Sequence, residues 1–149
     1  MAFSCRKCHF AECIRPTPIP QLLSALRQKR MYSSQVLDHF EHPRNAGTVA
    51  DADASARIEN PACGDVLELT LKVADGRIAE IRFKAKGCVA AMACGSAVTE
   101  LVSGRTVAEA GKFTREELVR AVGGLPAAST HASHLAIDTL AAVLRKLPR

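Results

Sequence analysis

Residues 66–83 alternate apolar with polar side chains on either side of an Asp-Gly pair. The apolar positions are Val66, Leu67, Leu69, Leu71 and Val73 before the pair, and Ile78, Ile81 and Phe83 after it. A period of two places alternate side chains on one face of a β-strand, and Asp75-Gly76 suits the two-residue turn of a hairpin. The sequence therefore predicts an antiparallel hairpin with one apolar face, which other parts of the chain must cover.

Helical patterns supply that cover. Beyond Gly87, apolar and small residues recur at helical spacing as far as Ser103-Gly104, at Cys94, Ala97, Val98, Leu101 and Val102. Shorter helices are predicted from Ser33 to Pro43, over 106–110 and over 114–122, and a longer one over about 130–145. Because most helices follow the strands, we predict an α+β fold, with helices on one face of a small antiparallel sheet of about three strands.

The positive charge of the chain lies in its first 30 residues. The formal net charge is +5, and residues 1–30 hold six Lys and Arg against Glu12 alone. Residues 31–149 are balanced and carry no basic stripe, so no nucleic-acid partner is expected. We separate a tail at 1–30, broken by three prolines, from one domain at 31–149. Three explanations of the tail stay open: a wrong upstream start before Met31, a disordered segment, or an Arg-rich targeting segment.

Cysteine usage indicates reduced thiols. Six cysteines in a secreted protein would suggest disulfides, but residues 1–30 lack the apolar core of an export signal. No apolar run approaches the roughly 18 residues that span a bilayer. We therefore expect a cytoplasmic protein without a membrane partner, whose thiols act as ligands or nucleophiles. Cys5, Cys8 and Cys13 lie in the tail, where a haem-attachment or metal pattern receives no assigned role.

Four potential metal ligands are spread along the domain. Cys63 and Asp65 flank Gly64, so their side chains point the same way in an extended chain. Cys88 stands at the predicted start of a helix, where free N–H groups favour a thiolate, and His131 lies in the first turn of the last helix. This donor set suits zinc or an iron-sulfur cluster. The residues alone leave open another interpretation, in which the cysteines are small core residues and the others cap local turns.

Four sequence blocks carry a resemblance to a known family. They are Asp38-His39-Phe40-Glu41-His42-Pro43-Arg44-Asn45, Asn60-Pro61-Ala62-Cys63-Gly64-Asp65, Lys86-Gly87-Cys88, and Leu125-Pro126 followed by His131. Through them the chain resembles IscU and the N-terminal domain of NifU, the scaffolds of iron-sulfur cluster biogenesis, over residues 31–149. The Pro-Ala-Cys-Gly-Asp block is the most specific of the four.

The resemblance implies a scaffold or carrier protein and not an enzyme. Such a protein receives sulfur from a cysteine desulfurase, builds a transient 2Fe-2S cluster and passes it to recipient apo iron-sulfur proteins. The resemblance also implies that Cys63, Asp65, Cys88 and His131 bind the cluster, or Zn²⁺ in its absence. Asp65 would keep the cluster labile, because a hard oxygen donor suits soft-ligand chemistry poorly.

The chain departs from the family at two places. Ala132 replaces the cysteine that directly follows the family histidine, so a ligand and sulfur acceptor is lost. Cys94 and His134 are the nearest substitutes, although both positions also fit the buried stripe of a helix. The segment after Leu125-Pro126 lacks the lysine of the family's chaperone-recognition loop, which weakens the expectation of an Hsp70-type partner.

Ala132 motivates a second hypothesis from a different class. The chain would then be a zinc-binding interaction module that docks on a cysteine desulfurase without assembling clusters. A third hypothesis, an enzyme with Cys63 as nucleophile and His131 as base, finds no supporting oxyanion donors in the sequence.

Overall fold

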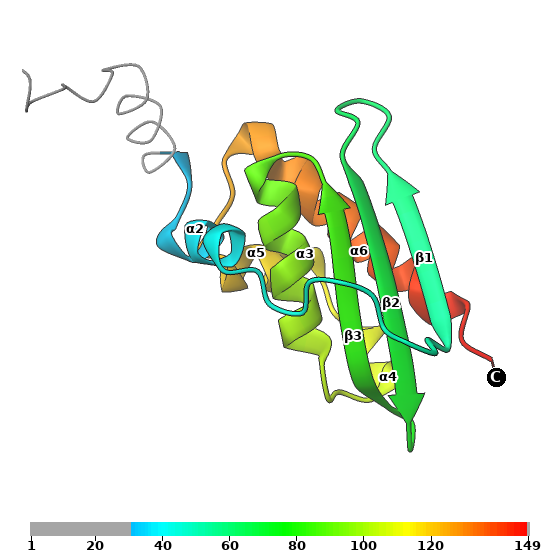
Figure 1. Ribbon diagram of the computed structural model, residues 1–149. Coiled ribbons are helices and arrows are strands. Elements are labelled where there is room, and N and C mark those ends of the chain that lie inside the picture. Colours follow the sequence, from blue (N-terminus) through cyan, green and yellow to red (C-terminus); the bar gives the residue numbers. More distant parts are fainter. Residues whose placement is uncertain (1–30, 149) are drawn as a thin grey trace, which may run out of the picture.

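The computed structural model describes residues 31–148, and it has a three-stranded sheet covered by helices. The strands are β1 (Ala54–Glu59), β2 (Val66–Ala74) and β3 (Arg77–Lys86), antiparallel in the order β1-β2-β3. The helices are α2 (Ser34–Glu41), α3 (Val89–Val102), α4 (Val107–Ala110), α5 (Arg115–Ala121), the short 3-10 helix η2 (Ala127–Ser129) and α6 (Thr130–Arg145). Helices α3 and α6 pack on the same face of the sheet (Figure 1). The predicted α+β class is confirmed.

The predicted hairpin forms as its alternation requires. Leu67, Leu69 and Leu71 are buried, and β2 pairs with β3 through a two-residue turn. Asp75 and Gly76 both have positive φ, 52° and 71°, as hairpin turns of this length demand. The hairpin is therefore specified locally, by alternation and by turn chemistry.

The sequence pattern did not locate β1. Its buried residues include Ala54 and Ala56, and apolar contrast along the strand is weak because these side chains are small. The strand is held by its pairing with β2 and by helix α6, which packs against it. Tertiary contacts thus create this strand where the sequence shows only a polar stretch rich in Ala and Asp.

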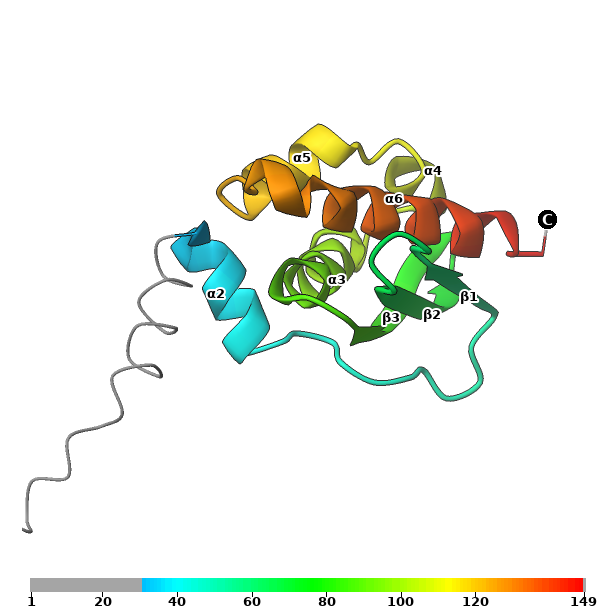
Figure 2. The same cartoon turned by 90° about the horizontal axis from the view of Figure 1, so that it is seen from above.

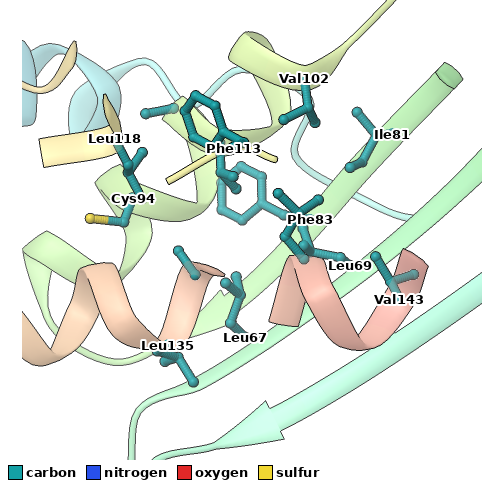
Figure 3. Packing of buried hydrophobic residues seen from close by; sticks show 14 of the residues in the cluster. Leu67, Leu69, Ile81, Phe83, Cys94, Val102, Phe113, Leu118, Leu135 and Val143 are labelled. Carbon is teal, nitrogen blue, oxygen red and sulfur yellow. The ribbon is translucent and has the colours of Figure 1, made fainter. Parts of the chain in front are cut away.

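The centre of the core lies where α3 approaches β3. Phe83 projects from β3 toward α3 among Leu67, Leu69 and the neighbouring helix (Figure 3). A Cβ at Gly95 would lie 2.7 Å from Phe83 Cδ2, so the missing side chain permits this close approach. Cys94 is also fully buried here, and burial raises the pKa of its thiol to about 12. The prediction that Cys94 is a core residue is confirmed.

Two backbone segments line the outer edge of β3. Gly47 N–H donates to the Phe83 carbonyl over 2.8 Å, and Phe83 N–H donates to the Asn45 carbonyl over 3.0 Å. At the other end of the strand, Ile78 N–H donates to the Arg105 carbonyl over 2.9 Å. After residues 45–47, the chain runs across the face of the sheet opposite to α6 before it enters β1 (Figure 2). There Val49 N–H donates to Thr70 Oγ1.

A polar network fastens the end of α2 to α3. Arg44 N–H donates to the fully buried Ser96 hydroxyl over 2.8 Å, and this hydroxyl lies 2.9 Å from His39 Nδ1. Arg44 Nη1 lies 3.1 Å from the same Nδ1, and Arg44 Nη2 lies 2.6 Å from Asp38 Oδ2. Because a guanidinium only donates, Nδ1 must accept, and the network requires a neutral imidazole. The motif around residues 38–45 therefore has a structural use.

Acidification is expected to weaken this network. Burial and the Arg44 charge lower the pKa of His39 from 6.5, although Glu100 nearby opposes the shift. As pH falls, the His39 side chain takes up a proton in the unfolded chain before it does so in the folded protein. The contribution of His39 to the free energy of unfolding therefore falls as pH drops below 6.5 and is constant above it. Urea denaturation at about pH 7.5 and 5.5 should show a smaller loss in His39→Gln than in wild type. Equal losses in both proteins would contradict the assignment.

The segment predicted as a tail, residues 1–30 with Cys5, Cys8 and Cys13, lies outside the described residues. Within residues 31–148, no helix combines the length and apolar character needed to cross a membrane.

Three helices begin where the sequence predicts. The side chains of Ser33, Thr106 and Thr114 each cap the helix that follows by accepting a backbone hydrogen bond from its first turn.

Candidate metal centre

The loop between β1 and β2 presents Cys63 and Asp65. Asn60 N–H donates to the Asp65 carbonyl over 2.8 Å, and Gly64 N–H donates to the Asn60 carbonyl over 2.7 Å. The Asn60 side chain also accepts from Ala62 N–H, so the loop closes on itself. Gly64 has a φ of 71°, a conformation that favours glycine. As a result Cys63 is exposed, whereas Asp65 turns inward at the start of β2 and is 4% exposed.

The Asp65 carboxylate is the centre of the site. Its Oδ1 accepts from Cys88 N–H over 3.1 Å, and its Oδ2 accepts from the Cys88 thiol over 3.3 Å. His131 Nε2 donates to the same Oδ2 over 3.1 Å. Three elements that are distant in the sequence therefore meet at one carboxylate.

Two helix starts bring in the other donors. Cys88 caps α3, where its sulfur accepts from Ala91 N–H over 3.4 Å. His131 follows the first residue of α6, and its Nε2 lies 3.9 Å from Cys88 Sγ. One ligand atom each from Cys63, Asp65 and His131 lie within 4.8 Å of one another. All four residues predicted from the sequence are thus brought to one place.

Hydrogen bonds set the ionisation of the carboxylate. Burial alone would raise the pKa of Asp65, but hydrogen bonds from Cys63, Cys88 and His131 outweigh burial and hold this pKa below its ordinary value. Asp65 is therefore an anion facing two thiols and an imidazole.

The expectation of a Cys88 thiolate is wrong for the thiol as it stands here. Burial raises the pKa of Cys88, and the Asp65 carboxylate raises it further. These effects exceed the opposing hydrogen bond from Ala91 N–H. A helix start favours a thiolate only where the sulfur is exposed and no anion is adjacent.

The suggested substitutes for the missing cysteine lie elsewhere. Ala132 is 1% exposed and packs in the core, and Cys94 is also buried there. His134 is exposed, one turn beyond His131, and Arg115 Nη1 donates to its Nε2 over 2.7 Å. The lone pair of His134 Nε2 is therefore engaged by Arg115. A cavity of about 330 Å³ borders His131 and His134, so the imidazole side of the site is open to solvent.

The role of Asn60 was missed in the sequence. The residue stands in the matching block, but nothing in its type alone revealed that its backbone and side chain close the loop. Asparagine beside proline was the available signal, because such pairs favour turns.

Comparison with known proteins identifies the family of the chain. The sequence model of the family described as NifU-like N terminal domain matches residues 31–149. An iron-sulfur cluster assembly scaffold protein IscU of Archaeoglobus fulgidus is 47% identical over 110 residues, covering 74% of this chain and 72% of the relative. The corresponding protein of Aquifex aeolicus is 40% identical over 111 residues, covering 73% and 71%.

A solved structure has a similar fold. The N-terminal NifU-like protein of Brucella abortus has a TM-score of 0.64 at 21% identity, covering 78% of this chain and 94% of that one. Fold, matching blocks and relatives agree, and the chain belongs to the NifU-like N-terminal domain family.

Proposed function

We propose that the chain is an iron-sulfur cluster scaffold or carrier whose cargo is a labile 2Fe-2S cluster, with Zn²⁺ as an alternative occupant. The observation that carries the proposal is the convergence of Cys63, Cys88 and His131 on Asp65. Two iron atoms bridged by two sulfides need four further ligands, and this set supplies four. The names of the relatives support the same function.

The geometry gives each donor a part in holding and releasing the cargo. Metal binding requires the thiols and His131 Nε2 to lose the protons that they share with Asp65, so the carboxylate exchanges these hydrogen bonds for a metal bond. Because a carboxylate is a hard ligand, its bond to iron is the weakest of the set. Cys63 is exposed at the rim, where the thiol of a recipient protein can replace it. The expected partners are a cysteine desulfurase and recipient apo iron-sulfur proteins.

Anaerobic reconstitution tests this function. Incubation with iron and sulfide is expected to give a visible-absorbing species with two irons and two acid-labile sulfides per chain. Cys63→Ala should abolish it, because one iron then lacks a thiolate. Cys94→Ala is the matched control, since that sulfur is buried in the core. A colourless wild-type protein would contradict the proposal.

A second candidate function is a zinc-binding module that docks on the desulfurase without building clusters. Ala132 favours it, because this buried methyl group can neither bind metal nor accept sulfur. The same reconstitution separates the two: the module binds one Zn²⁺ per chain, forms no cluster, and still binds the desulfurase after Cys63→Ala. Cluster formation in Ala132→Cys but not in wild type would favour the module.

A further inference from the structure

Gly87 leaves the space that the Asp65 carboxylate occupies. A Cβ on residue 87 would lie 2.2 Å from Asp65 Oδ1, 2.6 Å from its Cγ and 2.9 Å from its Cβ. Contacts this short do not occur between real atoms, so any side chain at 87 must displace the carboxyl group. Gly87, directly before Cys88 in the sequence, thereby determines where the Asp65 carboxylate can lie.

The carboxylate has little freedom to move aside. Its Oδ1 is held by Cys88 N–H, and its Oδ2 is held by the Cys88 thiol and His131. Its backbone is fixed by Asn60 N–H at the start of β2. The side chain is also buried, so a displaced carboxylate loses these partners before it reaches solvent.

Other glycines of the chain do not share this relation to the site. Gly87 shares a positive φ, 156°, with Gly64 and Gly104, so the backbone favours glycine at all three, but nothing would lie within 4 Å of a Cβ at Gly64 or Gly104. Gly95 is crowded too, but by Phe83 in the core. Among the described glycines, Gly87 meets a side chain of the metal centre.

We propose that Gly87 is a positioning residue of this centre: its missing side chain sets the place of the Asp65 carboxylate, and thereby the oxygen donor available to a metal. The part that concerns metal rests on the proposed function, whereas the placement of Asp65 does not. Two measurements therefore follow, one without metal and one with it.

The first measurement is hydrogen exchange of the Cys88 amide in the protein without metal. This N–H donates to Asp65 Oδ1, so its protection reports whether the carboxylate is in place. Gly87→Ala is expected to speed its exchange by at least about 10-fold, to the rate seen in Asp65→Ala. Gly104→Ala is the matched control, because it adds a Cβ at another positive φ, 76°, where nothing lies within 4 Å. A wild-type exchange rate in Gly87→Ala would overturn the proposal.

The second measurement is Zn²⁺ affinity in a double-mutant cycle. Gly87→Ala and Asp65→Ala are each expected to weaken binding by about 10-fold or more, and the double variant should bind as weakly as Asp65→Ala alone. The double variant also guards against misfolding, because it removes the crowded carboxyl group. Additive losses would overturn the proposal. A wild type that binds no Zn²⁺ would contradict the metal site, while amide exchange would still decide the role of Gly87.

Discussion

Replacement of Cys88 by alanine is expected to weaken Zn²⁺ binding by at least about 100-fold, because a direct ligand is worth more than the hydrogen-bonded partners whose loss costs 10-fold to 100-fold. The sulfur lies 3.3 Å from Asp65 Oδ2 and 3.9 Å from His131 Nε2. Cys94, further along α3, is fully buried in the core and cannot take its place. Competition against a chromophoric chelator measures the affinity.

The matched control for this prediction is Cys94→Ala. It makes the same change in the same helix, at a sulfur that is fully buried in the core. Zn²⁺ affinity should stay at the wild-type value, although the stability of the fold will fall slightly. If Cys88→Ala bound Zn²⁺ within twofold of wild type, Cys88 would not be a ligand.

The largest effect on stability is expected for Phe83→Ala, at about 3–5 kcal/mol of the free energy of unfolding. Phe83 is 3% exposed and projects from β3 toward α3 at the centre of the core (Figure 3). Truncation removes its buried area and leaves a cavity that the rigid sheet cannot close. Urea denaturation measures the loss.

Gly95→Ala provides a second test of that packing. In wild type the added methyl collides with Phe83 Cδ2 at 2.7 Å, so it should cost about 1–3 kcal/mol. In the Phe83→Ala background the methyl enters the cavity and keeps only its 3.0 Å contact with Leu67 Cδ1, so the cost should fall. Lys84→Ala, exposed on the same strand, is the control and should change stability by less than about 0.5 kcal/mol. Strictly additive losses would contradict the close approach of α3 to β3.

How well the sequence predicted each part depended on whether local chemistry determined it. The hairpin, the capped helices and the buried Cys94 follow from alternation, turn residues and helical spacing, all of which act over a few positions. Strand β1 does not, because its alanines become a core face only after α6 packs on them.

The site shows the same division. Residue type and the family resemblance were enough to nominate Cys63, Asp65, Cys88 and His131. The raised pKa of Cys88 was beyond local reasoning, because it depends first on burial of the sulfur and then on a carboxylate 23 positions away. His134 likewise had the right spacing from His131, but its environment is decided by Arg115 on another helix.

The segments beside β3 affect how the protein behaves at high concentration. An open strand edge can pair with another chain and seed aggregates. Here the backbone of residues 45–47 pairs with that edge at Phe83, and residues 104–105 pair with it at Ile78. At the opposite margin of the sheet, the described residues place the short strand β1, of six residues. Substitutions that loosen residues 45–47 should therefore promote self-association before they unfold the domain.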